Sequence, residues 1–495
     1  MSKGFFKAFT KNQWLAIIVA GLLLLLSTIN AGMNLSLFDI PAVTFSVLAI
    51  FLASITLWLF VSIDWPSILC LIALGFLPNM TYGEIFQQSF GNVTFVFLFF
   101  TFIVTYALEQ TLFLKRVSAW AINSPWAQAS PWRFVLAFLG VMLLIATFVS
   151  PTILFMIAFP IFEEIANQFG FEKGNKQASK LLIALFSTIA IGTAMTPINH
   201  VFAITAMGIY ESATGVGLSN GDYMSFAVPA GLAVFVILLG SLKWVWRLDL
   251  SKVKLSKVAS LEDLPKADHK EKRVVAIFSF VIFLWLMPEL FGFLLPGIAA
   301  FLKDAGIAFP PMVGTLLLAV INVDGKPIIK LQEAISKGVF WPSLLIVAAT
   351  LTLGSVLANP DMGVISLIEA FLTPFMASLS PLFMVALFLL WAGLQTNFSS
   401  NLVTASVVTT IVITVHGSLG DTSINLAVLT ALIGFMASVA LMTPPAMPYV
   451  AISIGSEWTT AKDTFLYGLY LLLWTTASAV FIGYLLGSQL LSHLV

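Results

Sequence analysis

The sequence is poor in charge and has almost no cysteine. Charged residues make up 9% of the 495 residues, whereas they make up about 25% of an ordinary soluble domain. Cys70 is the only cysteine, which excludes a disulfide within the chain. The net charge is formally zero, so nothing indicates a nucleic-acid partner. Hydrophobic residues make up 59%, more than a soluble core buries, and the composition therefore predicts a membrane protein.

Motifs for enzymatic chemistry are also missing. The chain contains no glycine-rich phosphate-binding loop, which argues against transport driven by ATP. It contains no cluster of histidine, aspartate and serine, or of cysteine, at a consistent depth in the apolar runs. We therefore expect neither enzyme activity nor a cofactor.

Many apolar runs approach the roughly 20 residues that a helix needs to cross the hydrocarbon core. The first run follows Lys3, Lys7 and Lys11 as in a signal peptide, but no small-residue cleavage site follows it, so we interpret it as the first spanning helix. Because basic loops stay in the cytoplasm, the lysines and arginines predict eleven spanning helices, with the N-terminus inside and the C-terminus outside. We expect an all-α, multi-pass protein of the cell membrane, in contact with the lipid bilayer.

Two further stretches carry a polar break within strongly apolar sequence. The first, 133–168, is interrupted at Ser150-Pro151-Thr152 and has basic residues near both ends, so both ends are expected in the cytoplasm. A segment that begins and ends on one side is a re-entrant hairpin. The second, 382–415, is interrupted at Ser399-Ser400-Asn401 and is expected to enter from outside. Polar irregular backbone at membrane depth survives only where it is buried in protein or lines a cavity.

Each hairpin is followed by a helix that proline interrupts. The predicted breaks are 192–200, around Pro197, and 443–448, which holds three prolines. Proline has no N–H to donate and clashes with the preceding turn, so the helices must open there. Pro197 lies 47 residues after Ser150, and Pro448 lies 48 residues after Ser400. This matched pair of hairpin and broken helix predicts the inverted repeats of a secondary transporter, with its site at the breaks.

The predicted plan has five parts. They are helices 1–3 in 1–88, a first repeat in 89–242, a cytoplasmic linker in 243–273, helices 7 and 8 in 274–338, and a second repeat in 339–495.

With these breaks the whole chain resembles the divalent anion/sodium symporter family, the INDY-type di- and tricarboxylate transporters. The family's Ser-Asn-Thr tip motif corresponds to 150–152 and 400–402, and its Thr-Pro-Pro-Asn-like loop to 196–199. The second loop is placed by Gly455 and the segment 458–463, which puts Met447 where the family often has threonine. The resemblance implies a homodimer that moves its substrate by an elevator mechanism, with the N-terminal helices of each repeat as the fixed scaffold.

Three departures from the family motifs bear on sodium. Pro151 replaces the first tip asparagine, Leu402 a tip threonine, and Met447 a loop hydroxyl. Hard cations require oxygen ligands, so we expect degraded sodium sites, no bound metal, and a resemblance to the family's sodium-independent exchanger branch. A sodium-coupled symporter is the first alternative, and an anion channel is the second.

The substrate is expected to be a dicarboxylate such as malate, succinate, fumarate or 2-oxoglutarate. No lysine or arginine lies in the tips or loops, so helix N-termini with their free N–H groups would hold the two carboxylates. His200 either supplies positive charge or is satisfied by helix carbonyls, and Asn397 has either a structural or a substrate role. The residues predicted to bind substrate are Ser150, Pro151, Thr152, Thr196, Pro197, Asn199, His200, Thr396, Asn397, Ser400, Asn401, Leu402, Met447 and Pro448.

Overall fold

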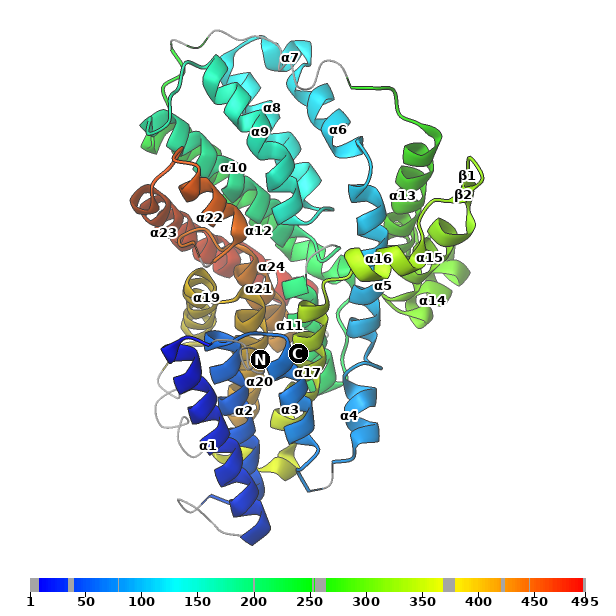
Figure 1. Cartoon of the computed structure of the whole chain (residues 1–495), viewed down its shortest axis with the longest axis vertical. Coiled ribbons are helices and arrows are strands. Elements are labelled where there is room, and N and C mark those ends of the chain that lie inside the picture. Colours follow the sequence, from blue (N-terminus) through cyan, green and yellow to red (C-terminus); the bar gives the residue numbers. More distant parts are fainter. Residues whose placement is uncertain are drawn as a thin grey trace, which may run out of the picture.

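A computed structural model describes most of the chain. It leaves out residues 1–8, 34–39, 79, 199–200, 252, 254–263, 368–378, 420–422, 445 and 493–495. The described residues are almost entirely helical; their only strands are the two-residue β1 (Asn322–Val323) and β2 (Lys326–Pro327), which pair antiparallel (Figure 1). The expected all-α fold class is confirmed.

The first half of the chain runs from the N-terminal helices to the end of the first repeat. Its elements are α1 (Lys11–Met33), α2 (Ala42–Phe60), α3 (Trp65–Leu74), α4 (Tyr82–Gln88), α5 (Val93–Glu109), α6 (Phe113–Ile122), α7 (Pro125–Gln128), α8 (Pro131–Ala146), α9 (Pro151–Gln168), α10 (Lys176–Met195), α11 (Val201–Thr214), α12 (Asn220–Gly240) and the π-helix η2 (Ser241–Val245).

The second half follows the linker. Its helices are α13 (His269–Leu290), α14 (Pro296–Ala305), α15 (Phe309–Val320), α16 (Leu331–Lys337), α17 (Trp341–Ala358), η4 (Pro360–Met362), α19 (Pro381–Phe398), α20 (Asn401–Leu419), α21 (Leu426–Ser438), α22 (Pro448–Gly455), α23 (Ala461–Ser478), η5 (Ala479–Tyr484) and α24 (Leu485–Leu490).

Both hairpin stretches fold as two helices around a short break. In the first, α8 and α9 flank residues 147–150, and in the second, α19 and α20 flank Ser399 and Ser400. Proline at the first helical position starts α8, α9 and α19, where its missing N–H has no helical partner to lose. The helical arms therefore coincide with the predicted stretches to within a few residues.

The two broken helices open at different places from those predicted. The first opens after Met195, where α10 ends, and so 192–195 are helical; α11 begins at Val201. The second opens after Ser438, where α21 ends, four residues earlier than the predicted start, and Pro448 is already the first residue of α22. The early end of α21 has a tertiary cause: the N–H groups of Leu441 and Met442 donate to the Asn397 side chain instead of to the preceding turn.

The number of spans found by length and composition is lower than eleven. Among the described residues, seven helices are long and apolar enough to cross a membrane, or nine if the bent pairs α4–α5 and α14–α15 each count as one. The predicted spans represented by α3 and α21 contain only 10 and 13 helical residues, fewer than a straight crossing requires. For α21 the reason is the break that follows it. The eleven-span topology stays a prediction.

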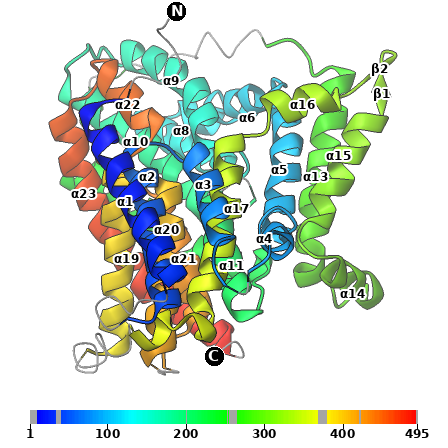
Figure 2. The same ribbon diagram turned by 60° about the horizontal axis from the view of Figure 1, so that its bottom comes forward.

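Several elements were not predicted. α14 joins α15 at an angle of 89°, and the strand pair and α16 follow α15 (Figure 2). α6 is tied to α13 by an ion pair in which Arg116 Nε lies 2.6 Å from Glu271 Oε1, and this partner raises the pKa of the Arg116 guanidinium. Short elements of mixed polar and apolar sequence carry little periodic signal.

Helices from the two halves are interleaved. α5 packs against α13 and α15, α3 packs against α17, and α11 packs against α17, α20 and α21 (Figures 1 and 2). Each half therefore completes the other's core, and the molecule is not two adjoining domains.

The tightest of these contacts depends on a glycine. A Cβ at Gly434 on α21 would lie 2.5 Å from the Ala203 Cα on α11. We expect Gly434→Ala to force the two backbones apart and to lower the free energy of unfolding by about 1–3 kcal/mol. Gly21→Ala on α1 is the matched control, since a Cβ there meets nothing within 4 Å. Thermal unfolding in detergent measures both, and equal midpoints for the two variants would contradict the packing.

Candidate functional site

The first hairpin tip is joined to the first broken helix by a buried hydrogen bond. The Thr196 hydroxyl donates to the carbonyl of Thr147, the residue that ends α8. Ser150 is the N-cap residue of α9, but its side chain makes no capping hydrogen bond, and Pro151 has no N–H. The first backbone donors of α9 are therefore those of Thr152 and Ile153, which the Ser150 side chain does not occupy.

The second hairpin tip is joined to the second broken helix in the same way, with more hydrogen bonds. We call each of these two contacts between a tip and a break a junction. The Thr396 hydroxyl donates to the Ala437 carbonyl over 2.9 Å, and the Thr443 hydroxyl donates to the Asn397 carbonyl. The Asn397 side-chain oxygen accepts from the N–H groups of Leu441 and Met442, each over 2.7 Å, and its Nδ2 donates to the Gly393 carbonyl. Buried Asn397 thus makes three side-chain hydrogen bonds within the protein, which favours its structural role over substrate binding.

Asn401, the first residue of α20, faces three oxygens. In the amide orientation that matches donors to acceptors, Asn401 Nδ2 lies 3.0 Å from Thr396 Oγ1, 3.1 Å from the Thr396 carbonyl and 2.9 Å from the Ala446 carbonyl, and its two N–H groups are shared among these three oxygens. Its side chain therefore connects Thr396, just before the second tip, to Ala446 in the second break.

The two junctions belong to one packed body. The ring of Tyr449, in the first turn of α22, lies 5.9 Å from the Phe155 ring on α9 and 5.8 Å from the Phe186 ring on α10, between centroids. The Trp458 indole donates to Glu163 over 2.9 Å, which connects α9 to the segment that follows α22.

Polar contacts continue this connection at the N-terminal end of α10. The hydroxyls of Ser179 and Thr459 lie 2.7 Å apart, and the Gly174 N–H donates to the Glu457 carbonyl over 3.1 Å. Hairpin and broken helix of the first repeat are therefore fastened to the broken helix of the second.

The predicted residues differ in their exposure. Those that are partly or fully exposed are Ser150, Thr152, Ser400 and Pro448. Those that are buried are Pro151, Thr196, Pro197, Thr396, Asn397, Asn401, Leu402 and Met447. Asn199 and His200 lie outside the described residues.

Sequence reasoning missed four residues that shape the junctions: Thr147, Thr443, Tyr223 and Tyr449. The two threonines belong to the polar breaks and had that signal. The tyrosines had none, because an aromatic residue in apolar sequence is usually packing.

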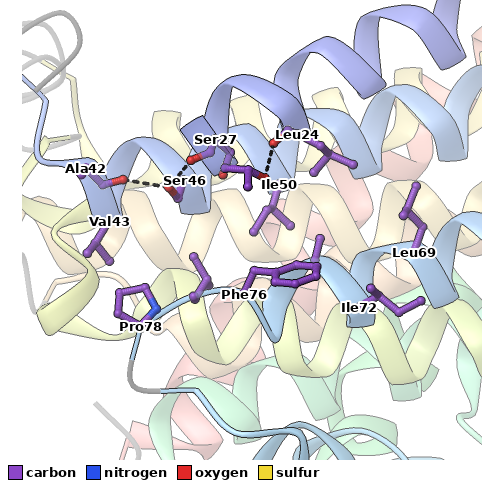
Figure 3. A pocket seen from close by; sticks show the side chains of 13 residues that line it. Leu24, Ser27, Ala42, Val43, Ser46, Ile50, Leu69, Ile72, Phe76 and Pro78 are labelled. Atoms are coloured by element: carbon purple, nitrogen blue, oxygen red, sulfur yellow. Dashed lines mark hydrogen bonds between the residues drawn. The ribbon is translucent and has the colours of Figure 1, made fainter. Parts of the chain in front are cut away.

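A cavity of about 790 Å³ lies elsewhere, between α1, α2 and the end of α3 (Figure 3). Its walls are mostly apolar, and the hydroxyl of Ser46 is already bonded to the Ala42 carbonyl over 2.9 Å. No residue of a tip or a break lines it. This groove is therefore separate from the junctions.

The chemistry available at the junctions is that of backbone and hydroxyl donors. Four helices, α9, α11, α20 and α22, begin there, and helix N-termini carry free N–H groups and partial positive charge that suit an anion. No lysine or arginine occurs in the tips or breaks. The described residues contain no group of three or more histidine, cysteine, aspartate or glutamate side chains able to hold a metal ion.

An all-α polytopic chain with two helical hairpins and two broken helices is typical of a membrane transporter. A family model described as a citrate transporter, CitMHS, matches residues 53–434, most of the chain. The chain belongs to this transporter family, and its predicted relationship to the divalent anion/sodium symporters is confirmed. It is a multi-pass protein of the cell membrane.

Two individual proteins are similar along nearly the whole length. The sodium-dependent dicarboxylate transporter SdcS of Staphylococcus saprophyticus is 27% identical over 474 residues, covering 88% of this chain and 86% of the relative. The crystal structure of the YdaH transporter of Alcanivorax borkumensis has a TM-score of 0.59 at 13% identity, covering 98% of this chain and 99% of that one, and so shares the fold.

The structural role of Asn397 is testable against another buried asparagine. Asn397→Ala leaves the Leu441 and Met442 N–H groups without their acceptor, at a cost of about 1–3 kcal/mol each, and should displace the second break. We expect a lower unfolding midpoint and a KM for labelled succinate that is at least about fivefold higher.

Asn425→Ala is the control, because Asn425 accepts from Val428 N and donates to the Leu491 carbonyl at the opposite end of α21. It should lower the midpoint with an unchanged KM. An Asn397→Ala variant with the wild-type KM would show that the break does not shape the binding site.

Proposed function

We propose that this protein exchanges dicarboxylates across the cell membrane without sodium. The class of substrate is supported by the name of the 27% identical relative, a dicarboxylate transporter, and by the citrate transporter family model. C4 and C5 dicarboxylates suit the junctions because each half of the site offers uncharged donors at helix N-termini, and a dianion presents one carboxylate to each.

Sodium independence depends chiefly on Asn401. Its amide nitrogen lies within 3.1 Å of three oxygens that converge between the second tip and the second break. A hard cation would need those oxygens as ligands, whereas the orientation that matches donors to acceptors places a neutral amide donor among them. Pro151, Leu402 and Met447 remove three further polar groups from the positions where sodium-coupled relatives carry them.

Sodium-coupled symport is the second candidate, and a specific observation favours it. The relative is named as sodium-dependent. If the Asn401 amide turns over, its oxygen joins the same three oxygens, and four oxygens facing one another require a cation between them. The orientation of one amide thus separates the two functions.

For the transport step we propose an elevator movement in a homodimer. The contacts from Glu163 to Trp458 and from Ser179 to Thr459 fasten α9 and α10 to α22 and α23, so these helices would move as one body. The fixed scaffold would comprise the helices that precede each repeat in the five-part plan, in 1–88 and 274–338. The junctions would carry the substrate with them, because their hydrogen bonds lie within that body.

Uptake of labelled succinate or 2-oxoglutarate into liposomes tests the proposal. We expect uptake that requires unlabelled dicarboxylate inside and has the same rate in sodium and in potassium. Empty liposomes are the control. Uptake into empty liposomes that requires sodium would establish symport instead, and sodium-independent flux without an internal dicarboxylate would establish a channel.

The amide orientation has its own test in Asn401→Asp. A carboxylate cannot donate to the three oxygens and repels them, so the exchanger should lose transport at least tenfold, by analogy with burying an unpaired charge. Ser336→Ala on exposed α16 is the control and should transport as the wild type does. An Asn401→Asp variant that keeps wild-type transport in sodium but not in potassium would place an oxygen and a cation at this position.

A further inference from the structure

Tyr449 connects the two ends of the second break. It is the second residue of α22 and is completely buried. Its hydroxyl donates to the Ala440 carbonyl over 3.1 Å, and Ala440 lies at the start of the break. The hydrogen bond therefore connects the first turn of α22 to the start of the break and fixes where α22 begins.

The ring of the same residue reaches the first repeat. Phe155 lies one turn into α9, whose N-terminus is the first tip, and Phe186 lies on α10. Both rings pack on Tyr449, the Phe186 ring in a stacked arrangement with 23° between planes. The N-terminal turns of α9 and α22 are thus held apart by the thickness of this aromatic contact.

Tyr223 on α12 is the counterpart in the first repeat. Its hydroxyl donates to the Ala194 carbonyl over 2.6 Å, next to the end of α10, and its ring packs 5.7 Å from Phe226 on its own helix. These contacts anchor one side of the first break but lie within one repeat. A hydroxyl bond at the break is therefore common to both repeats, whereas the bridge through the ring belongs to Tyr449.

We propose that Tyr449 is a positioning residue that sets the separation of the two half-sites and so the length of the dicarboxylate accepted. This inference rests on the proposed dicarboxylate transport. If one carboxylate binds at each half-site, the spacing between the N-termini of α9 and α22 is the dimension that a longer carbon chain must match. The hydroxyl fixes the position of α22 relative to the start of the second break. The ring, through its contact with Phe155, fixes the position of α22 relative to the first tip.

The test measures exchange of succinate, glutarate and adipate, which have four, five and six carbons, and compares their apparent KM values. Tyr449→Phe keeps the ring and removes only the hydroxyl. We expect the succinate KM to rise about fivefold, the effect of one net hydrogen bond. We also expect the ratio of adipate KM to succinate KM to fall about fivefold, because the loosened break admits longer chains.

Two other tyrosines serve as controls. Tyr223→Phe should raise the KM of all three acids alike and leave the ratio unchanged. Tyr484→Phe removes a hydroxyl that accepts from the Asn425 N–H over 3.0 Å, at the far end of α21. It should lower the thermal midpoint without changing either KM or the ratio.

An unchanged ratio in folded Tyr449→Phe overturns the inference, since a merely structural role alters stability and not discrimination by length. If that variant does not fold, Phe155→Leu probes the same contact from α9, and there too a fall in the ratio is expected and its absence overturns the inference. Wild-type exchange of dicarboxylates with an unchanged variant ratio leaves the proposed function standing. A wild type that exchanges none of the three acids overturns both.

Discussion

Backbone groups at membrane depth must find partners within the protein, and this requirement governs the two junctions. Each broken helix exposes carbonyls and N–H groups that have no water to bond. Tips and breaks supply each other's missing partners: the Thr196 hydroxyl of the break bonds the Thr147 carbonyl in the first repeat, and Thr396, Asn397 and Asn401 of the tip bond the break in the second. The backbone of a tip and that of a break therefore depend on each other for hydrogen-bond partners.

The same requirement separates the residues that build the site from those that are free to bind. The Asn397 side chain makes hydrogen bonds that hold the break, and the Asn401 side chain connects tip and break. By contrast, no side-chain cap occupies the N-terminus of α9, and Ser150 and Thr152 there are partly exposed. An anion is thus offered helix N-termini and hydroxyls on a frame whose own polar groups are already satisfied.

Interleaving of the two halves gives this frame its rigidity. Tyr449 of the second repeat packs between Phe155 and Phe186 of the first, and the Trp458 indole bonds Glu163. Contacts of this kind make the paired sites one body, which is the property that movement of a bound substrate through the membrane requires. They also explain why buried tyrosines, which look like ordinary core residues, are placed beside both breaks.

The sequence by itself determined the fold class, the four breaks and their pairing, because hydropathy, charge and proline act locally and leave a pattern along the chain. Thus the arms of both hairpins and the opening at Pro197 were predictable from neighbours in sequence. Only the tertiary structure decided that α21 ends at Ser438. The N–H groups of Leu441 and Met442 donate to the side chain of Asn397, which lies more than forty residues away in sequence, and not to the last turn of α21. The roles of Tyr223 and Tyr449 were likewise tertiary, because their hydroxyl partners are selected by folding and leave no periodic trace.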